Sequence, residues 1–172
     1  MGSGMRHLIL GILVLSSTAC ATATVEPGHR ALLFAPDRGG LQREVLPPGG
    51  YKLASGTRLE DFDVTYAKRD IPLRVTTRDG KPLSAKVTVV YRPILNELYS
   101  LETEEGQNYY DSVIAPEVLD AAREVLEEST AEADFARTSK LDASLVAAAR
   151  KHTAGKHVEI ADVVVGDLTL AP

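Results

Sequence analysis

Residues 71–93 decide the fold of this chain and read IPLRVTTRDGKPLSAKVTVVYRP. Before the turn-forming residues in the middle, apolar side chains occupy alternate positions at Ile71, Leu73 and Val75. After the turn, the alternation resumes from Leu83 to Tyr91 and is broken only by Val90. Because successive side chains of a strand point to opposite faces, this pattern predicts two strands that each bury one face.

The turn between the two strands sets their register. A two-residue turn at Asp79-Gly80 would place Val75 opposite the polar Ser84. A three-residue loop, Arg78 to Gly80, instead places apolar residues opposite one another throughout: Val75 with Leu83, Leu73 with Ala85 and Ile71 with Val87. We therefore predict the three-residue loop, with Gly80 in the left-handed conformation.

The chain that precedes this hairpin, from Val25, also has the character of β-structure. Short apolar runs are separated by Pro- and Gly-rich clusters at residues 36–40 and 47–50, which are typical of turns. Within this part, Glu60, Asp61 and Asp63 form the strongest carboxylate cluster. Asp61 and Asp63 would share one strand face and Glu60 the other, so we interpret the cluster as a solvated strand in preference to a cation-binding or acid/base site.

After Pro93 the periodicity changes to that of helices. Pro116 is expected in the first turn of an amphipathic helix, whose apolar face comprises Val118, Leu119, Ala122, Val125 and Leu126. Ser139 is expected to cap a second helix that ends before Gly155 and has an inward face of Leu141, Leu145, Val146 and Ala149. Residues 158–170 form a final apolar run with a predicted bulge or break at Gly166. An antiparallel β-rich half, then amphipathic helices and a closing strand predict an α+β domain.

Residues 1–19 have the features of a signal peptide. The basic Arg6 precedes an apolar run that is too short to span a bilayer comfortably, and small residues then lead to Cys20. This arrangement resembles a bacterial lipoprotein signal, although Ser17 stands where that pattern favours an aliphatic residue. The resemblance implies cleavage before Cys20, lipid modification of its thiol, and a lipid-anchored flexible tether over residues 20–24. Ordinary secretion and an uncleaved anchor are the alternatives.

The composition argues against nucleic acid as a partner. The 172 residues contain 19 Lys and Arg against 24 Asp and Glu, a net charge of −5, whereas a phosphate-binding protein needs a basic surface. Removal of residues 1–19 would take away Arg6 and change the net charge from −5 to −6. Electrostatic attraction would then not hold the chain to an anionic bilayer, so we expect a lipid on Cys20 to hold it to the membrane.

The sequence contains no motif that predicts an enzyme, and we expect no catalytic residues, cofactor or metal site. It has no Gly-x-Ser-x-Gly elbow, Walker loop or dinucleotide fingerprint, and its single thiol lies at the signal junction. The four histidines lack metal-ligand spacing, and we interpret His152 and His157 as surface residues around a helix end. A solvated loop is expected for the acidic residues Glu102, Glu104 and Glu105.

The order of these signals resembles the SPFH (stomatin, prohibitin, flotillin) family, and its prohibitin branch in particular. Val25-Glu26-Pro27-Gly28 is similar to the family's opening strand, and Thr77-Arg78-Asp79-Gly80 to a Thr-x-Asp-Gly turn that leads into a strand ending in Tyr91-Arg92-Pro93. Further similar segments are Pro48-Gly49-Gly50-Tyr51, residues 106–116 and residues 167–172. The resemblance covers about residues 25–172, and we interpret most of its motif residues as determinants of the fold.

This resemblance implies an SPFH/prohibitin-like domain at residues 25–172 and a membrane-anchored, non-enzymatic scaffold. Such a protein would self-associate or bind other SPFH proteins, and would organise or restrain membrane proteins such as proteases. Together with lipidation of Cys20, it implies a lipoprotein on the extracytoplasmic side of the bacterial cell envelope. Family members usually continue into a coiled-coil segment, and residues 1–172 contain no heptad run. That departure favours the alternative of a monomeric envelope lipoprotein that acts as an adaptor or binding module for one protein partner.

Overall fold

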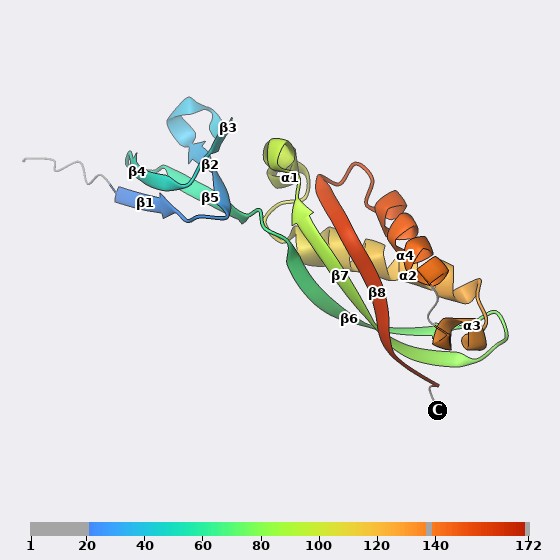
Figure 1. The fold of residues 1–172 in the computed structure, drawn as a ribbon. Coiled ribbons are helices and arrows are strands. Elements are labelled where there is room, and N and C mark those ends of the chain that lie inside the picture. The colour runs from blue at the N-terminus through green and yellow to red at the C-terminus, as the bar shows by residue number, and fades with distance from the viewer. Residues whose placement is uncertain (1–20, 137–138, 171–172) are drawn as a thin grey trace, which may run out of the picture.

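The computed structural model describes residues 21–136 and 139–170 and confirms the α+β class (Figure 1). Strands β1 to β5 form an N-terminal arm (residues 21–63), and the three strands β6 to β8 carry the helices in a body (residues 67–170). Arm and body lie end to end, so the molecule is elongated. β1 lies at the end remote from α3 (Ala131–Phe135) and α4 (Ser139–His152) (Figure 1).

Two small antiparallel sheets make up the arm. In one, β1 (Ala21–Val25) pairs with β4 (Gly49–Leu53); in the other, β2 (His29–Ala35) pairs with both β3 (Gly40–Leu46) and β5 (Arg58–Asp63). The predicted turn clusters lie where expected, between β2 and β3 and between β3 and β4.

Strand β1 corrects the prediction of a flexible tether at residues 20–24. Its residues pair with β4 from Ala21↔Leu53 to Val25↔Gly49, and Val25 is only 2% exposed. The segment Ala-Thr-Ala-Thr has no alternation of strongly apolar and polar residues, so its own pattern does not predict a strand. The ordered domain therefore begins at least as early as Ala21.

Strand β2 connects the arm to the core of the body because both of its faces are covered. Leu32 of β2 and Phe62 of β5 belong to the main core cluster, whereas the neighbouring Ala31 points the other way and is fully buried outside that cluster. In addition, the guanidinium carbon of Arg43 lies 4.2 Å from the ring centroid of Tyr99 in α1 (Leu98–Glu104). These contacts hold the arm against the body.

The body sheet has the order β6 (Ala67–Thr76), β7 (Pro82–Pro93), β8 (Val158–Leu170), and each strand is antiparallel to its neighbour. The backbone amide of Thr77 donates to the carbonyl of Lys81 at 3.0 Å, which closes the predicted three-residue loop, and Gly80 has φ +77°. The predicted register is confirmed by the pairs Ile71↔Val87, Leu73↔Ala85 and Val75↔Leu83.

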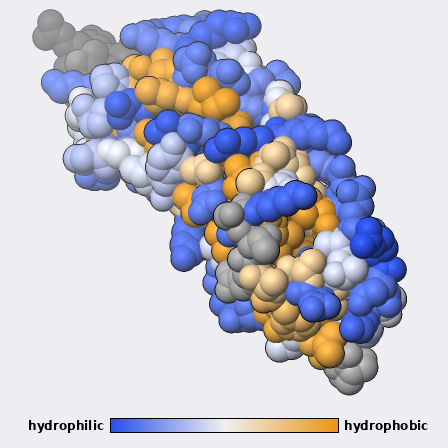
Figure 2. All heavy atoms as spheres, turned by 45° about the vertical axis from the view of Figure 1, so that its right-hand side comes forward, coloured by the Kyte–Doolittle hydropathy of each residue, from blue (hydrophilic) through white to orange (hydrophobic). Residues whose placement is uncertain are grey.

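One face of this sheet forms the main core and is covered by α2 (Ala115–Glu127) and α4 (Ser139–His152) (Figure 1). The opposite face of β6 and β7 is not covered by helices in the described part of the chain, and we call it the open face. Its outward-pointing residues, at even positions within 68–76 and 82–92, are all exposed or half-buried. Hydrophilic side chains cover most of the surface seen in Figure 2, and apolar residues show between them over both arm and body.

Both predicted helices are observed, as α2 and α4. Pro116 lies in the first turn of α2, as predicted, but helical backbone begins earlier, in the π-helical turn η3 (Tyr110–Ile114) that continues into α2. Proline lacks an amide hydrogen and its ring clashes with the carbonyl one turn before it, and a π turn relieves that conflict. The predicted inward residues of α2 are buried or half-buried: Val118, Leu119, Ala122, Val125 and Leu126.

Helix α4 ends as the sequence predicts. Arg150, Lys151 and His152 form its last turn, and Gly155 follows with φ +78°. Of the predicted inward face, Leu145 and Ala149 are buried and Leu141 and Val146 are half-buried. The predicted capping by Ser139 concerns a side chain that lies outside the described residues.

Strand β8 shifts its register against β7 at two places. The predicted bulge at Gly166 is confirmed: Lys86 pairs with Gly166 but Ser84 pairs with Thr169. The second shift lies near Ala161, opposite Val90 and Tyr91, and was not predicted. It changes the buried set from the even-numbered residues Val158 and Ile160 to the odd-numbered residues Val163 and Val165.

Candidate functional site

The tip of the β6–β7 hairpin is joined to the helices by hydrogen bonds. Thr77 is buried, with 4% of its surface exposed, and its hydroxyl donates to Asp79 Oδ1 at 2.6 Å. The same oxygen accepts the backbone amide of Ala131, at the start of α3 (Ala131–Phe135), at 3.1 Å. These bonds, with that from Thr77 contributing most, lower the pKa of Asp79 to about 2. The Thr-x-Asp-Gly turn therefore fixes the hairpin to the helical layer.

A second carboxyl group, that of Asp134, is fully buried beside this turn. Its Oδ1 accepts the hydroxyl of Ser129, whose carbonyl accepts the backbone amide of Arg78 at 2.9 Å. Burial raises the pKa of Asp134, and its Oδ2 has no hydrogen-bond partner within the described part of the chain. The sequence gives no signal for Asp134, because one acidic residue in a polar stretch carries no sign of burial.

Three tyrosines from two separate motif segments meet in the body. The ring of Tyr91 stacks on that of Tyr110 with centroids 5.5 Å apart and meets the ring of Tyr109 edge-on at 6.5 Å. Burial raises the pKa of Tyr109 to about 12. The guanidinium carbon of Arg69 lies 5.8 Å from the ring centroid of Tyr110. The cluster joins the start of the α2 helical segment to the end of β7, so these two motifs act together in packing.

Next to this cluster, Arg92 forms an ion pair with Glu159 on the open face of the sheet. Its Nη2 lies 2.7 Å from Glu159 Oε2, and its guanidinium carbon lies 4.4 Å from the ring centroid of Tyr66. The hydroxyl of Tyr66 donates to Glu159 Oε1 at 2.9 Å. Hydrogen bonds, first from Arg92 and then from Tyr66, lower the pKa of Glu159. Both carboxylate oxygens thus have donors, which is the arrangement of a structural contact between strands.

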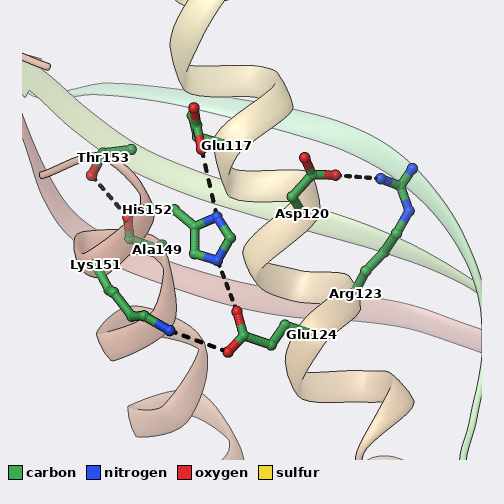
Figure 3. Close-up of polar contacts among 8 residues, drawn as sticks. All are labelled: Glu117, Asp120, Arg123, Glu124, Ala149, Lys151, His152 and Thr153. Carbon is green, nitrogen blue, oxygen red and sulfur yellow. Dashed lines mark hydrogen bonds and ion pairs between the residues drawn. The ribbon is translucent and has the colours of Figure 1, made fainter.

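His152 lies between two carboxylates of α2 (Figure 3). Its Nε2 is 2.8 Å from Glu124 Oε2 and its Nδ1 is 3.5 Å from Glu117 Oε2, while Lys151 Nζ is 3.4 Å from Glu124 Oε1. Glu117 and Glu124 are seven residues apart and therefore lie on one side of α2, two turns from each other. The side chain of His152 is 24% exposed. It lies in the last turn of α4, as expected for a residue around a helix end, and in addition it joins α4 to α2.

His157, five residues after His152 and directly before β8, also lies between two carboxylates. Its Nδ1 lies 2.9 Å from Glu97 Oε2 and its Nε2 lies 3.2 Å from Glu104 Oε2, and its side chain is 15% exposed. Burial alone would lower the pKa of His157, but the hydrogen bond with Glu97 and the nearby negative charge of Glu104 outweigh it and raise the pKa. Glu102 and Glu104 belong to α1, so the prediction of a solvated loop at residues 102–105 was wrong for these two.

The acidic cluster in the arm divides as its spacing predicts. Asp61 is exposed and its Oδ2 lies 2.6 Å from Nδ1 of His29 on β2, whereas Glu60 pairs with Arg58 at 2.6 Å. Asp63 accepts the backbone amide and the hydroxyl of Thr65 at 2.9 and 2.7 Å. The three carboxylates do not converge on one point.

Within residues 21–136 and 139–170, no group of three or more His, Cys, Asp and Glu is arranged to hold a metal ion. No helix in this part of the chain is long and apolar enough to cross a membrane. The predicted lipidation site, Cys20, lies outside the described residues, and the next residue, Ala21, already belongs to β1. The polar groups at the hairpin tip and around Glu159, His152 and His157 are contacts that join distant elements of the fold.

These motif contacts lie within a region that matches a known family. The sequence model of the SPFH domain / Band 7 family matches residues 23–172. The chain belongs to this family. Prohibitin 1 of Drosophila melanogaster is 34% identical over 118 residues, which make up 65% of this chain and 42% of that protein. The expected likeness to the prohibitin branch is confirmed, and the chain spans less than half the length of this relative.

The two histidine contacts of this SPFH domain were missed by sequence reasoning, although a signal for them exists. Glu97 and Glu104, like Glu117 and Glu124, are seven residues apart, a spacing that puts both carboxylates of a pair on one side of a helix. The histidines that bind them follow 28 to 60 residues later in the chain. Only the packing of α1 and α2 against the segment from α4 to β8 brings them together.

Proposed function

We propose that this SPFH domain is a non-enzymatic scaffold held on a membrane through a lipid on Cys20, after removal of residues 1–19. The protein faces the extracytoplasmic side of a bacterial envelope membrane. There it associates with copies of itself or with other SPFH proteins, and it organises or restrains neighbouring membrane proteins such as proteases.

The observation that carries this proposal is the start of β1 directly after Cys20. Ala21 pairs with Leu53 of β4, so an anchor on Cys20 is followed by ordered backbone without a free tether. β1 lies at the end of the molecule remote from α3 and α4 (Figure 1). A lipid at that end would hold the arm at the bilayer and leave the sides of the body free for neighbours.

The charge of the chain supports a lipid as the means of attachment. A net charge of −5, or −6 without Arg6, is repelled by anionic lipids. One acyl chain alone gives reversible binding, so durable attachment requires more than one chain on the anchor. Confinement of many copies to one surface raises their effective concentration, which favours association through weak contacts.

A second candidate function is that of a monomeric adaptor for one protein partner. It is favoured by Leu95, a residue that is 46% exposed and lines a surface cavity. Val64, Arg92, Pro93 and Glu159 also line this cavity. An apolar side chain bordered by polar and charged residues at a hollow of the surface has the arrangement of an interface core with its polar rim. A single short partner segment would suffice to cover it.

Two forms of the protein distinguish these functions. The full chain isolated from membranes in detergent is compared with soluble residues 21–172 by native mass spectrometry and single-particle imaging at matched concentration. We expect the full chain to form large assemblies and soluble residues 21–172 to be monomeric. If both forms are monomeric, the adaptor function is favoured.

The anchor is tested separately with Cys20→Ser. This variant should fold normally and leave the membrane fraction. If it remains in that fraction although residues 1–19 have been removed, the lipid anchor is wrong.

A further inference from the structure

The two outer strands of the body sheet carry charges of opposite sign. β6 contains the basic residues Lys68, Arg69 and Arg74 and one acidic residue, Asp70. β8 contains three acidic residues, Glu159, Asp162 and Asp167, and no Lys or Arg. β6 and β8 lie on opposite sides of β7, so one side of the body carries the basic residues and the other the acidic ones. We call these sides the β6 rim and the β8 rim. Glu159 and Asp167 already form ion pairs with Arg92 and Lys86 of β7, so Asp162 is the carboxylate of β8 for which the described residues supply no ion pair.

Both rims border a strand that has a pairing partner on one side only. Among the described residues, the sheet consists of β6, β7 and β8 in that order. An outer strand exposes main-chain groups and side chains that another chain can pair with. Such an edge on each side of the same sheet allows copies to associate side by side.

The register places residues of opposite charge at the same height on the two rims. Lys68 pairs with Val90 of β7, and Val90 pairs with Asp162 of β8. Residues directly opposite one another in a sheet share a face, so Lys68 and Asp162 both lie on the open face. Both residues are exposed. β6 and β8 are parallel to each other because each is antiparallel to β7.

We propose that the β6 rim of one copy of this chain docks against the β8 rim of the next, with Lys68 of one copy beside Asp162 of its neighbour. If the second copy is displaced only sideways from the first, without a shift along the strands, its Lys68 lies next to Asp162 of the first copy on the same face. This interface rests on the self-association in the proposed function and assigns it a surface. It is a head-to-tail contact, which closes into a ring when the rotation between successive copies permits.

Two features limit main-chain pairing across this interface and leave its specificity to the side chains. Pro72, in the middle of β6, has no amide hydrogen to donate. On β8, the guanidinium of Arg150 donates to the carbonyls of Ile160 and Ala161 at 2.9 and 3.1 Å. Exposed ion pairs are weak and screened by salt. The contact is therefore suited to copies that a membrane already holds side by side.

A charge exchange tests the interface. Lys68→Glu and Asp162→Lys are each made in the full chain, isolated from membranes and reconstituted into vesicles. Each variant alone places like charges together at every interface, and we expect its association constant to fall roughly fivefold or more. In an equimolar mixture every interface between the two variants again joins opposite charges, so assembly should recover. Cross-linking and single-particle imaging measure the assembled fraction.

Matched controls carry the same changes of charge away from the rims. Lys52→Glu on β4 and Glu127→Lys on α2 alter exposed residues and should assemble like the wild type. If the wild type assembles and the two rim variants assemble equally well, or their mixture does not recover, the interface is overturned and the scaffold function stands. A wild type that stays monomeric on vesicles overturns the scaffold function and the interface with it.

Discussion

The carboxylate of Asp79 accepts a hydrogen bond from the backbone amide of Ala131 at 3.1 Å, although 52 residues separate them. Asp79 lies in the turn of the β6–β7 hairpin and Ala131 begins α3. An amide in the first turn of a helix has no partner within that helix, so a carboxylate from elsewhere supplies it. The turn thus serves both the hairpin and the start of α3.

Asp79→Ala should lower the melting temperature near neutral pH, because it removes acceptors for Thr77 and Ala131. The pKa of Asp79 falls from an ordinary 3.8 to about 2 on folding. Its stabilising effect is therefore complete above the ordinary value and is lost as pH falls through about 2. Thermal unfolding followed by circular dichroism should show that the difference in melting temperature between wild type and variant shrinks as the pH falls from 3.8 to about 2. Glu127→Ala, on the exposed side of α2, serves as the control, and a constant difference down to pH 2 would contradict the assignment.

Val87→Asp should destabilise the fold by roughly 3–5 kcal/mol, because Val87 is fully buried opposite Ile71 and an unpaired charge would replace it. Ser84→Asp is the matched control on the open face of the same strand. It lies opposite Arg74, so its effect should stay within about 0.5 kcal/mol. Urea unfolding measures both free energies. Equal losses in the two variants would show that β7 does not bury one face only.

Gly28→Ala should destabilise by about 2–3 kcal/mol, because Gly28 has φ +87° and an added Cβ would lie 3.0 Å from Thr65 Cγ2. Gly56→Ala is the control: Gly56 has φ +79°, and nothing lies within 4 Å of an added Cβ. Gly56→Ala should destabilise the fold only by the cost of a left-handed backbone conformation for a residue with a Cβ, about 1–2 kcal/mol. The difference between the two variants, from chemical denaturation, isolates the contact between Gly28 and Thr65. No difference would mean that the contact is readily relieved.

His157 should stabilise the fold more at acid than at alkaline pH. Its pKa is raised above the ordinary 6.5 on folding, so its contribution is complete below 6.5 and is lost as pH rises through the raised value. His157 has φ +61°, a conformation that Asn tolerates. His157→Asn should therefore lower the melting temperature more at pH 5.5 than at pH 9. Glu97→Gln combined with Glu104→Gln should remove this pH dependence, and its persistence would refute the contact.

The hairpin of residues 71–93 was predictable in detail from the sequence. The alternation of Ile71, Leu73 and Val75, together with the turn ending at Gly80, selects one register, and that register is the one observed. The inward face of α2 and the bulge at Gly166 were predictable for the same reason. In each case the information lies in residues a few positions apart, since strand and helix periodicities are properties of neighbouring residues.

The pairing of β1 with β4, the contacts of His152 and His157, and the matching heights of Lys68 and Asp162 were decided only by the tertiary structure. Ala21 to Thr24 have no strand periodicity of their own, and neither histidine has a carboxylate at helical spacing. These relationships depend on which elements pack side by side and in what register. That choice follows from burial of the whole core, to which each local segment contributes only a part.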